Sequence, residues 1–248
     1  MSRVLITGGG AGIGRAMGEA FAEAGYEVWV TDVDAVALDA CPDTWHRRQA
    51  SAADEDAMAQ VIAEAGPLDT LCANAGIAGP TALVEDIALD AWRDCLAVNL
   101  EGAFLAAKHA IPAMKAAGAG SIVLTSSTAG QYGFPNRAPY AAAKWAVIGL
   151  MKTLAMELGP FGIRANAICP GPVDGPRMAG VIDREAAAKG IDRAALHDAY
   201  VKGISMRSFV TARDVAEMAV FLGSPKARLV SGQVIAVDGH LENPDPKV

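Results

Sequence analysis

The chain has 248 residues, of which 52% are hydrophobic, and this is enough to form one large core. Its formal net charge is −7 and it contains no basic run, which argues against a nucleic-acid or anionic-membrane partner and favours small molecules. No apolar stretch approaches the roughly 20 residues of a membrane span, and the start lacks a cleavable signal, so we expect a cytoplasmic protein without a membrane partner.

Short β-rich runs alternate with segments of helical spacing along the chain. The expected strands are residues 3–7, 27–31, 44–48, 68–73, 121–126, 163–168 and 233–237. The expected helices are residues 12–24, 54–65, 88–116, 140–158 and 212–223, with Asp54 as an N-cap. This alternation predicts a doubly wound α/β fold, in which helices cover both faces of a seven-stranded parallel sheet. No linker or repeat interrupts it, so we expect a single domain over residues 1–248.

The segment 172–208 departs from this alternation. It is punctuated by Pro and Gly and contains two short helical pieces, which is typical of a lid above the edge of a sheet. Its charges are nearly balanced, and we interpret most of them as solvated helix faces. They are Arg177, Arg184, Lys189, Arg193, Lys202 and Arg207 against Asp174, Asp183, Glu185, Asp192 and Asp198. One of these arginines binding a carboxylate remains open.

A glycine-rich turn, TGGGAGIG at residues 7–14, follows the first expected strand and opens the first helix. Gly8, Gly12 and Gly14 leave backbone N–H groups and the positive helix end accessible to a pyrophosphate. Ligands of such sheets bind beyond the carboxyl ends of the strands. The alternative interpretation is that these glycines are needed only to form the turn and bind no ligand.

Asp32 ends the second expected strand, where a carboxylate accepts hydrogen bonds from an adenosine ribose and repels a 2′-phosphate. Ala11 in the glycine turn supplies no basic side chain, although Arg15 follows at the start of the helix. We therefore expect NAD in preference to NADP. A solvated charge at a strand end is the alternative for Asp32.

The stretch PYAAAKWAV places Tyr140 and Lys144 four residues apart on an expected helix. Side chains at this spacing share one helix face, so the ammonium lies near the phenol and lowers its pKa from about 10. Tyr140 is then a candidate general base. An isolated pair of this kind is more often a core tyrosine beside a lysine that extends to solvent.

Cysteines and histidines occur at wide spacings, and neither set has the spacing of metal ligands. We expect no metal site and interpret the cysteines as reduced packing residues.

Taken together, these motifs resemble those of the classical short-chain dehydrogenase/reductase family, and the resemblance runs from about Arg3 to Gly239. The matching elements are the TGGGAGIG turn, Asn74-Ala75-Gly76, Asn99, Ser127, the pair Tyr140 and Lys144, and Pro170-Gly171. Ser127 lies thirteen residues before Tyr140, the interval usual in that family.

The resemblance implies a Rossmann fold and an NAD-dependent oxidoreductase acting on the CH–OH group of a small polar alcohol, such as a sugar, polyol or hydroxy acid. It implies that Tyr140 is the general base, Lys144 lowers its pKa and holds a ribose, Ser127 binds the substrate oxygen, and Asn99 holds a water. The cofactor-binding residues are Gly8, Gly12, Ile13, Gly14, Asp32, Asn74, Ala75, Gly76, Tyr140, Lys144, Pro170, Gly171 and Val173. The substrate-binding residues are Ser127, Gln131 and Tyr140, with Asn136 and Arg137 also placed to touch substrate.

The sequence also departs from the family pattern. Ser51 stands where an Asp commonly contacts the adenine, and Gly175 stands where a Thr often binds the carboxamide. An enoyl reductase would separate the Tyr and Lys by more than the four residues seen here. The alternative function is a non-catalytic NAD-dependent sensor that retains the fold.

The helices 100–117 and 144–158 carry more apolar surface than one sheet face covers, which predicts a homotetramer. The residues concerned are Phe104, Leu105, Trp145, Leu150, Met151 and Leu154. In the resembled family these two helices often pair across a two-fold axis. The ending LENPDPKV is expected to extend over a neighbouring subunit.

Overall fold

Seven parallel strands form the central sheet in the order β3-β2-β1-β4-β5-β6-β7 in a computed structural model that describes residues 1–242. The strands are β1 (Arg3–Thr7), β2 (Glu27–Asp32), β3 (His46–Gln49), β4 (Thr70–Ala73), β5 (Gly120–Thr125), β6 (Ile163–Pro170) and β7 (Val234–Val237). The predicted doubly wound α/β fold is confirmed. Successive strands are added outward from β1 on one side and outward from β4 on the other. The carboxyl ends of β1 and β4 therefore flank the switch point at which such folds bind ligands.

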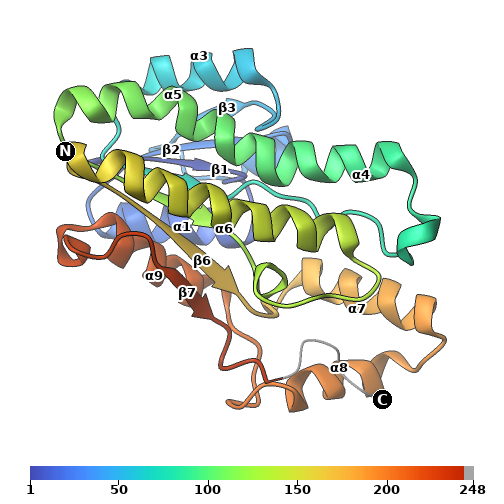
Figure 1. Cartoon of the computed structure of the whole chain (residues 1–248). Helices are drawn as coiled ribbons and strands as arrows, with labels where there is room; N and C mark the ends of the chain where they lie inside the picture. Colours follow the sequence, from blue (N-terminus) through green and yellow to red (C-terminus); the bar gives the residue numbers. More distant parts are fainter. Residues whose placement is uncertain (243–248) are drawn as a thin grey trace.

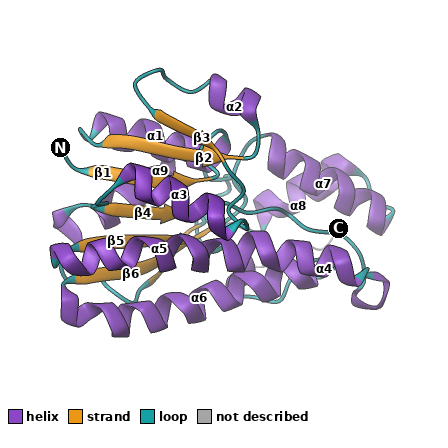
Figure 2. Cartoon of the chain, turned by 90° about the horizontal axis from the view of Figure 1, so that it is seen from above, coloured by secondary structure: helices purple, strands orange, loops and turns teal. Residues whose placement is uncertain are grey.

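Helices cover both faces of the sheet (Figures 1 and 2). One face carries α3 (Glu55–Ala65), α5 (Gly102–Ala117) and α6 (Ala138–Leu158), which enclose a core with Leu71, Ile122 and Met151. The other face carries α1 (Gly12–Glu23) and α9 (Ala212–Gly223), which pack on Ile6, Val30 and Val123. The central strands β1, β2, β4 and β5 are largely apolar on both sides, as a sheet covered on both faces requires, whereas the edge strand β3 is polar and mostly exposed.

Several expected element boundaries shift for local reasons. Asp54 caps α3 as predicted, accepting a hydrogen bond from the Ala57 N–H at 3.0 Å. An unpredicted short helix, α2 (Ala35–Asp39), forms because the Asp34 carboxylate accepts from two of its N–H groups, at 3.0 and 3.1 Å. The third strand begins at His46 instead of residue 44. The side chain of the preceding residue, Trp45, turns inward and is buried against α1.

The expected helix 88–116 is three elements: α4 (Leu89–Leu96), a π-helical turn (Ala97–Glu101) and α5. A π turn widens the helix by one residue and is frequent at functional sites. The predicted Asn99 lies in it. Short 3-10 turns complete the described chain at Val84–Asp86, Thr128–Gly130, Gly159–Phe161 and Pro225–Ala227.

The two helical pieces predicted within 172–208 are α7 (Pro176–Lys189) and α8 (Arg193–Lys202). Figure 1 shows both beyond the carboxyl ends of the strands. They enclose a small core of their own that contains Ile182, Leu196 and Tyr200. This segment therefore roofs the switch point.

The apolar residues of α5 and α6 divide into two groups. Leu105, Met151 and Leu154 are buried in the core, whereas the Phe104 and Trp145 side chains are 47% and 52% exposed. Only part of the apolar surface predicted for these two helices is therefore exposed to solvent in the single chain. The prediction for the chain end falls largely on residues 243–248, outside the described residues. Within residues 1–242, each helix is too short or too polar to cross a bilayer.

Candidate active site at the carboxyl edge of the sheet

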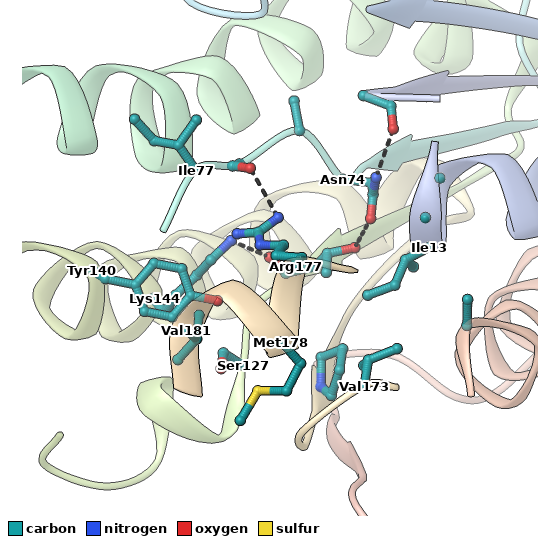
Figure 3. Close-up of a pocket in the computed structure, with 18 of the residues that line it drawn as sticks. Ile13, Asn74, Ile77, Ser127, Tyr140, Lys144, Val173, Arg177, Met178 and Val181 are labelled. Atoms are coloured by element: carbon teal, nitrogen blue, oxygen red, sulfur yellow. Dashed lines mark hydrogen bonds between the residues drawn. The ribbon is translucent and has the colours of Figure 1, made fainter. Parts of the chain in front are cut away.

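A cavity of about 620 Å³ lies at the carboxyl ends of the central strands. It is lined at one end by the glycine-rich turn and Asp32, and at the other by Tyr140, Lys144 and the first turn of α7. Figure 3 shows Ile13 of the glycine-rich turn on one side of this space and Tyr140 and Lys144 on the other. The cavity volume suits an extended ligand together with a small second molecule.

The glycine-rich turn is held by contacts that only glycine permits. A Cβ on Gly14 would lie 2.0 Å from the Gly8 carbonyl oxygen, and a Cβ on Gly8, whose φ is +64°, would lie 2.9 Å from Ala75 Cα. Gly12 has φ +54° and faces open space. Because no side chain caps α1, its first N–H groups are available to an anion. This cradle fits the pyrophosphate of a dinucleotide.

Asn74 connects this turn to the middle of the sheet. Its Nδ2 donates to the carbonyl oxygens of Thr7 and Gly8, both at 3.2 Å, and its Oδ1 accepts from the Thr125 hydroxyl at 3.2 Å. The Thr7 hydroxyl accepts from the backbone N–H groups of Asn74 and Ala75, both at 3.0 Å. The side chain of Asn74 thus positions the turn through protein contacts.

Asp32 lies at the tip of β2, on the rim of the cavity. One carboxylate oxygen accepts from the Gly10 N–H at 3.0 Å and the other from the Asp34 N–H at 3.2 Å. Arg15 pairs with Glu19 at 3.1 Å. Ser51, the residue in place of the family's Asp, also lines the cavity.

The catalytic pair predicted from the sequence lies together on α6. Lys144 is 3% exposed, its Nζ donates to the Thr125 carbonyl at 2.8 Å, and it lies 5.6 Å from the centre of the Tyr140 ring. Arg137 lies over the same ring, with its guanidinium carbon 4.4 Å from the centre. Figure 3 shows Arg177 entering the cavity beside Tyr140 and Lys144.

These cations set the ionisation of Tyr140. Burial acts to raise the pKa of the phenol, but the charges of Lys144, Arg177 and Arg137, with the Ser127 hydroxyl, outweigh it and the pKa is lowered. Burial is also the main cause that lowers the pKa of Lys144, which the phenol opposes. The arrangement therefore favours phenolate at a lower pH than an ordinary tyrosine.

Asn99 is oriented by the π turn. Its Nδ2 donates to the Ile77 and Cys95 carbonyl oxygens at 3.0 and 2.9 Å, while its buried Oδ1 has no partner within residues 1–242. A Cβ at Gly76 would lie 2.6 Å from that oxygen and 3.4 Å from Lys144 Nζ. The unsatisfied acceptor thus lies near the ammonium, and a buried acceptor of this kind normally binds water.

Ser127 lines the cavity and its Oγ accepts from the Ala129 N–H at 3.1 Å. Gln131 follows in the next turn and is not among the lining residues; Phe134 and Arg137 of the same loop are. Pro170, Gly171 and Val173 line the opposite wall.

Gly175 has φ +139°, a conformation that residues with a side chain rarely adopt. A Thr at this position would be strained in this backbone conformation.

Glu185 is an exception to the expectation that most lid charges lie on solvated helix faces. Its side chain is buried, accepts a 2.5 Å hydrogen bond from the Tyr200 hydroxyl and pairs with Lys189 at 2.7 Å. The four-residue spacing of Glu185 and Lys189 indicates an ion pair. It does not indicate which face of the helix is buried. Arg177 was likewise grouped with the lid charges, and it enters the cavity.

Comparison with known proteins identifies the family of this chain. A family model described as Enoyl-(Acyl carrier protein) reductase matches residues 8–241. Cis-4-hydroxycyclohexanecarboxylate dehydrogenase of Sinomonas cyclohexanicum is 38% identical, over 95% of this chain and 94% of the relative. The solved structure of NAD⁺-bound xylitol dehydrogenase has a TM-score of 0.91 at 28% identity, covering 96% of this chain and 98% of that one. An actinorhodin polyketide ketoreductase with NADPH has a TM-score of 0.91 at 29% identity, covering 98% and 97%.

The chain belongs to the classical short-chain dehydrogenase/reductase family. It is an alcohol dehydrogenase/reductase of that family, acting on a CH–OH group with NAD(P).

We predict that Tyr140 titrates before an ordinary tyrosine in a tyrosinate absorbance titration. Because its pKa is lowered, the phenolate fraction rises as pH increases through a value below about 10. The Tyr140→Phe variant should lose this early step. Tyr26→Phe is the matched control and should lose a late step, since burial raises the pKa of Tyr26. An early step that survives in Tyr140→Phe would contradict the prediction.

Proposed function

We propose that the protein is an NAD-dependent oxidoreductase in which Tyr140 removes the hydroxyl proton of a small polar alcohol. The observation that carries this proposal is the lowered pKa of a phenol that lies at the wall of the cavity among three cationic side chains. A phenol with such a pKa exchanges a proton near neutral pH more readily than a free tyrosine. The four-residue spacing of Tyr140 and Lys144 favours alcohol chemistry over enoyl reduction.

The cofactor would be held from both ends of the cavity. The first turn of α1, with Gly12, Ile13 and Gly14, would bind the pyrophosphate, and Asp32 the adenosine ribose. Lys144, with Asn74-Ala75-Gly76, would hold the nicotinamide ribose, and Pro170, Gly171 and Val173 would face the nicotinamide. When bound, the nicotinamide supplies the hydride acceptor or donor of the reaction.

The residues of this chain would perform the proton transfer. The Ser127 hydroxyl would hydrogen-bond the substrate oxygen and orient it toward the Tyr140 oxygen. Lys144 would stabilise the phenolate by its charge. Asn99 Oδ1 would hold a water beside Lys144, which gives the proton a route toward solvent. Gln131, which lies outside the cavity lining, would contact the substrate only at its outer end.

We propose NAD in preference to NADP because of the position of the Asp32 carboxylate. A carboxylate at the end of β2 repels a 2′-phosphate, and Arg15 in α1 is paired with Glu19 instead of being free to bind one. The xylitol dehydrogenase neighbour with NAD⁺ agrees with this choice, whereas the ketoreductase neighbour carries NADPH.

We predict that Tyr140→Phe lowers the rate of alcohol oxidation by about 10²-fold or more, because general base catalysis contributes about 10² to 10⁴. NAD binding, measured by calorimetry, should change little because the hydroxyl serves the proton step. Tyr26→Phe, outside the cavity, is the control and should retain full rate. Substantial oxidation by Tyr140→Phe would exclude the phenol as base.

We predict that Asp32→Asn shifts cofactor preference toward NADP. The amide keeps an acceptor for the Gly10 N–H but removes the charge, so the ratio of kcat/KM for NADP to that for NAD should rise about tenfold or more. Asp34→Asn is the control, since its carboxylate caps α2 and lies outside the cavity lining. An unchanged ratio in Asp32→Asn means that selectivity lies elsewhere.

We also propose a homotetramer with two-fold interfaces, one of them formed by α5 and α6. The exposed Phe104 and Trp145 support it, because large exposed apolar side chains on adjacent helices are typical of subunit contacts. Light scattering should give four times the 25.5 kDa chain mass. Trp145→Glu should reduce this mass, whereas Val36→Glu, at a 78% exposed site on α2, should not. A stable, active monomer would refute the proposal.

A further inference from the structure

Arg137 is a guanidinium in the wall of the cavity that has no acidic partner among residues 1–242. It lies three residues before Tyr140, its guanidinium covers the face of that ring, and its Nη2 donates to the Ala78 carbonyl at 3.3 Å. Within residues 1–242 no carboxylate forms an ion pair with it. Burial lowers the pKa of Arg137, as expected for a cation partly removed from water. Such a group is costly unless an anion binds it.

Arg177 brings a second guanidinium to the same space. It lies in the first turn of α7, reaches across the cavity and donates through Nη1 to the Gly76 carbonyl at 3.0 Å (Figure 3). It too has no ion pair in the described part of the chain. A cation in the first turn opposes the helix dipole, so this position does not stabilise α7. The Arg177 side chain faces the cavity, and this explains its position better than a contribution to the stability of α7 does.

The other charges near the two arginines are already engaged or lie apart from them. Glu185 is bound by the Tyr200 hydroxyl and by Lys189. Lys144 donates to the Thr125 carbonyl, and Asp32 accepts backbone N–H groups at the opposite end of the cavity. Asp174 is exposed and is the remaining carboxylate among the lining residues. The substrate end of the cavity is therefore positively charged.

The rest of that end is apolar. Phe134, Met178 and Val181 line it, together with Tyr200, which is 2% exposed. Apolar walls with two guanidinium groups suit a compact hydrocarbon body that carries one anionic group, because a guanidinium binds a carboxylate through paired hydrogen bonds. A neutral polyol offers no charge to either arginine and would leave its hydroxyls against apolar walls.

We infer that the substrate is a hydroxy acid whose carboxylate is bound by Arg137 and Arg177 while its hydroxyl meets Tyr140. This inference rests on the proposed function, since it assigns the substrate of that same site. Both arginines are specificity-determining residues in it. The carboxylate lies close to the reacting hydroxyl, because Arg137 stacks on the ring of the proposed base.

The first test compares each acid with its uncharged amide. Hydroxycyclohexanecarboxylate and β-hydroxybutyrate are oxidised with NAD beside their carboxamides, and kcat/KM should favour the acids by about tenfold or more. Arg137→Gln and Arg177→Gln should each reduce this ratio about tenfold. Using the ratio removes any effect of the arginines on Tyr140 itself, since that effect is common to acid and amide. Arg184→Gln, exposed on α7 outside the cavity, is the control.

The second test measures binding without turnover. Cyclohexanecarboxylate and cyclohexanecarboxamide are titrated calorimetrically into the protein saturated with NAD. The acid should bind about tenfold or more tightly than the amide, and each cavity arginine variant should lose this difference. Arg184→Gln should keep it.

The two proposals fail in different ways. Equal oxidation of acids and amides, with equal binding of the two probes, would overturn the carboxylate site and leave the oxidoreductase function standing. Preferential, arginine-dependent binding of the acid with no oxidation of any alcohol would support the carboxylate site and contradict the proposed function.

Discussion

A chain of hydrogen bonds through Asn74 connects the two ends of the site. Its amide holds the glycine-rich turn at Gly8, its oxygen accepts from Thr125, and the Thr125 carbonyl accepts from Lys144, which lies beside Tyr140. This chain fixes the catalytic helix relative to the cofactor cradle. It depends on the parallel sheet, because only parallel strands bring these carboxyl ends to one edge.

The site gathers three cationic side chains around one cavity, and their mutual repulsion opposes stability. Lys144, Arg137 and Arg177 repel one another, and the pKa of both Lys144 and Arg137 is lowered by burial. The same crowding lowers the pKa of Tyr140 and would give the cavity the proposed affinity for an anion. One electrostatic arrangement thus supports both the proposed base and the proposed recognition of a carboxylate.

Much of the fold was predictable because local rules agree with the final packing. Strand and helix alternation predicted the sheet, and the Asp54 cap formed where expected. The expected helix over 88–116 is present as a continuous helical run over 89–117, but the π turn around Asn99 within it was not predicted. The Asn99 side chain donates to the Ile77 carbonyl, which lies outside the helix. Helical periodicity carries no signal for such a turn.

The sequence alone determined the fold class and the pair Tyr140 and Lys144, because helix periodicity and motif spacing are properties of neighbouring residues. Whether a lid charge is solvated or faces the cavity depends on how α7 packs against the sheet, and only the tertiary structure decided that Arg177 turns inward and Glu185 is buried. A charged side chain gives the same signal in sequence on either face of a helix. The role of such a side chain depends on which residues from distant parts of the sequence pack next to it in the folded chain.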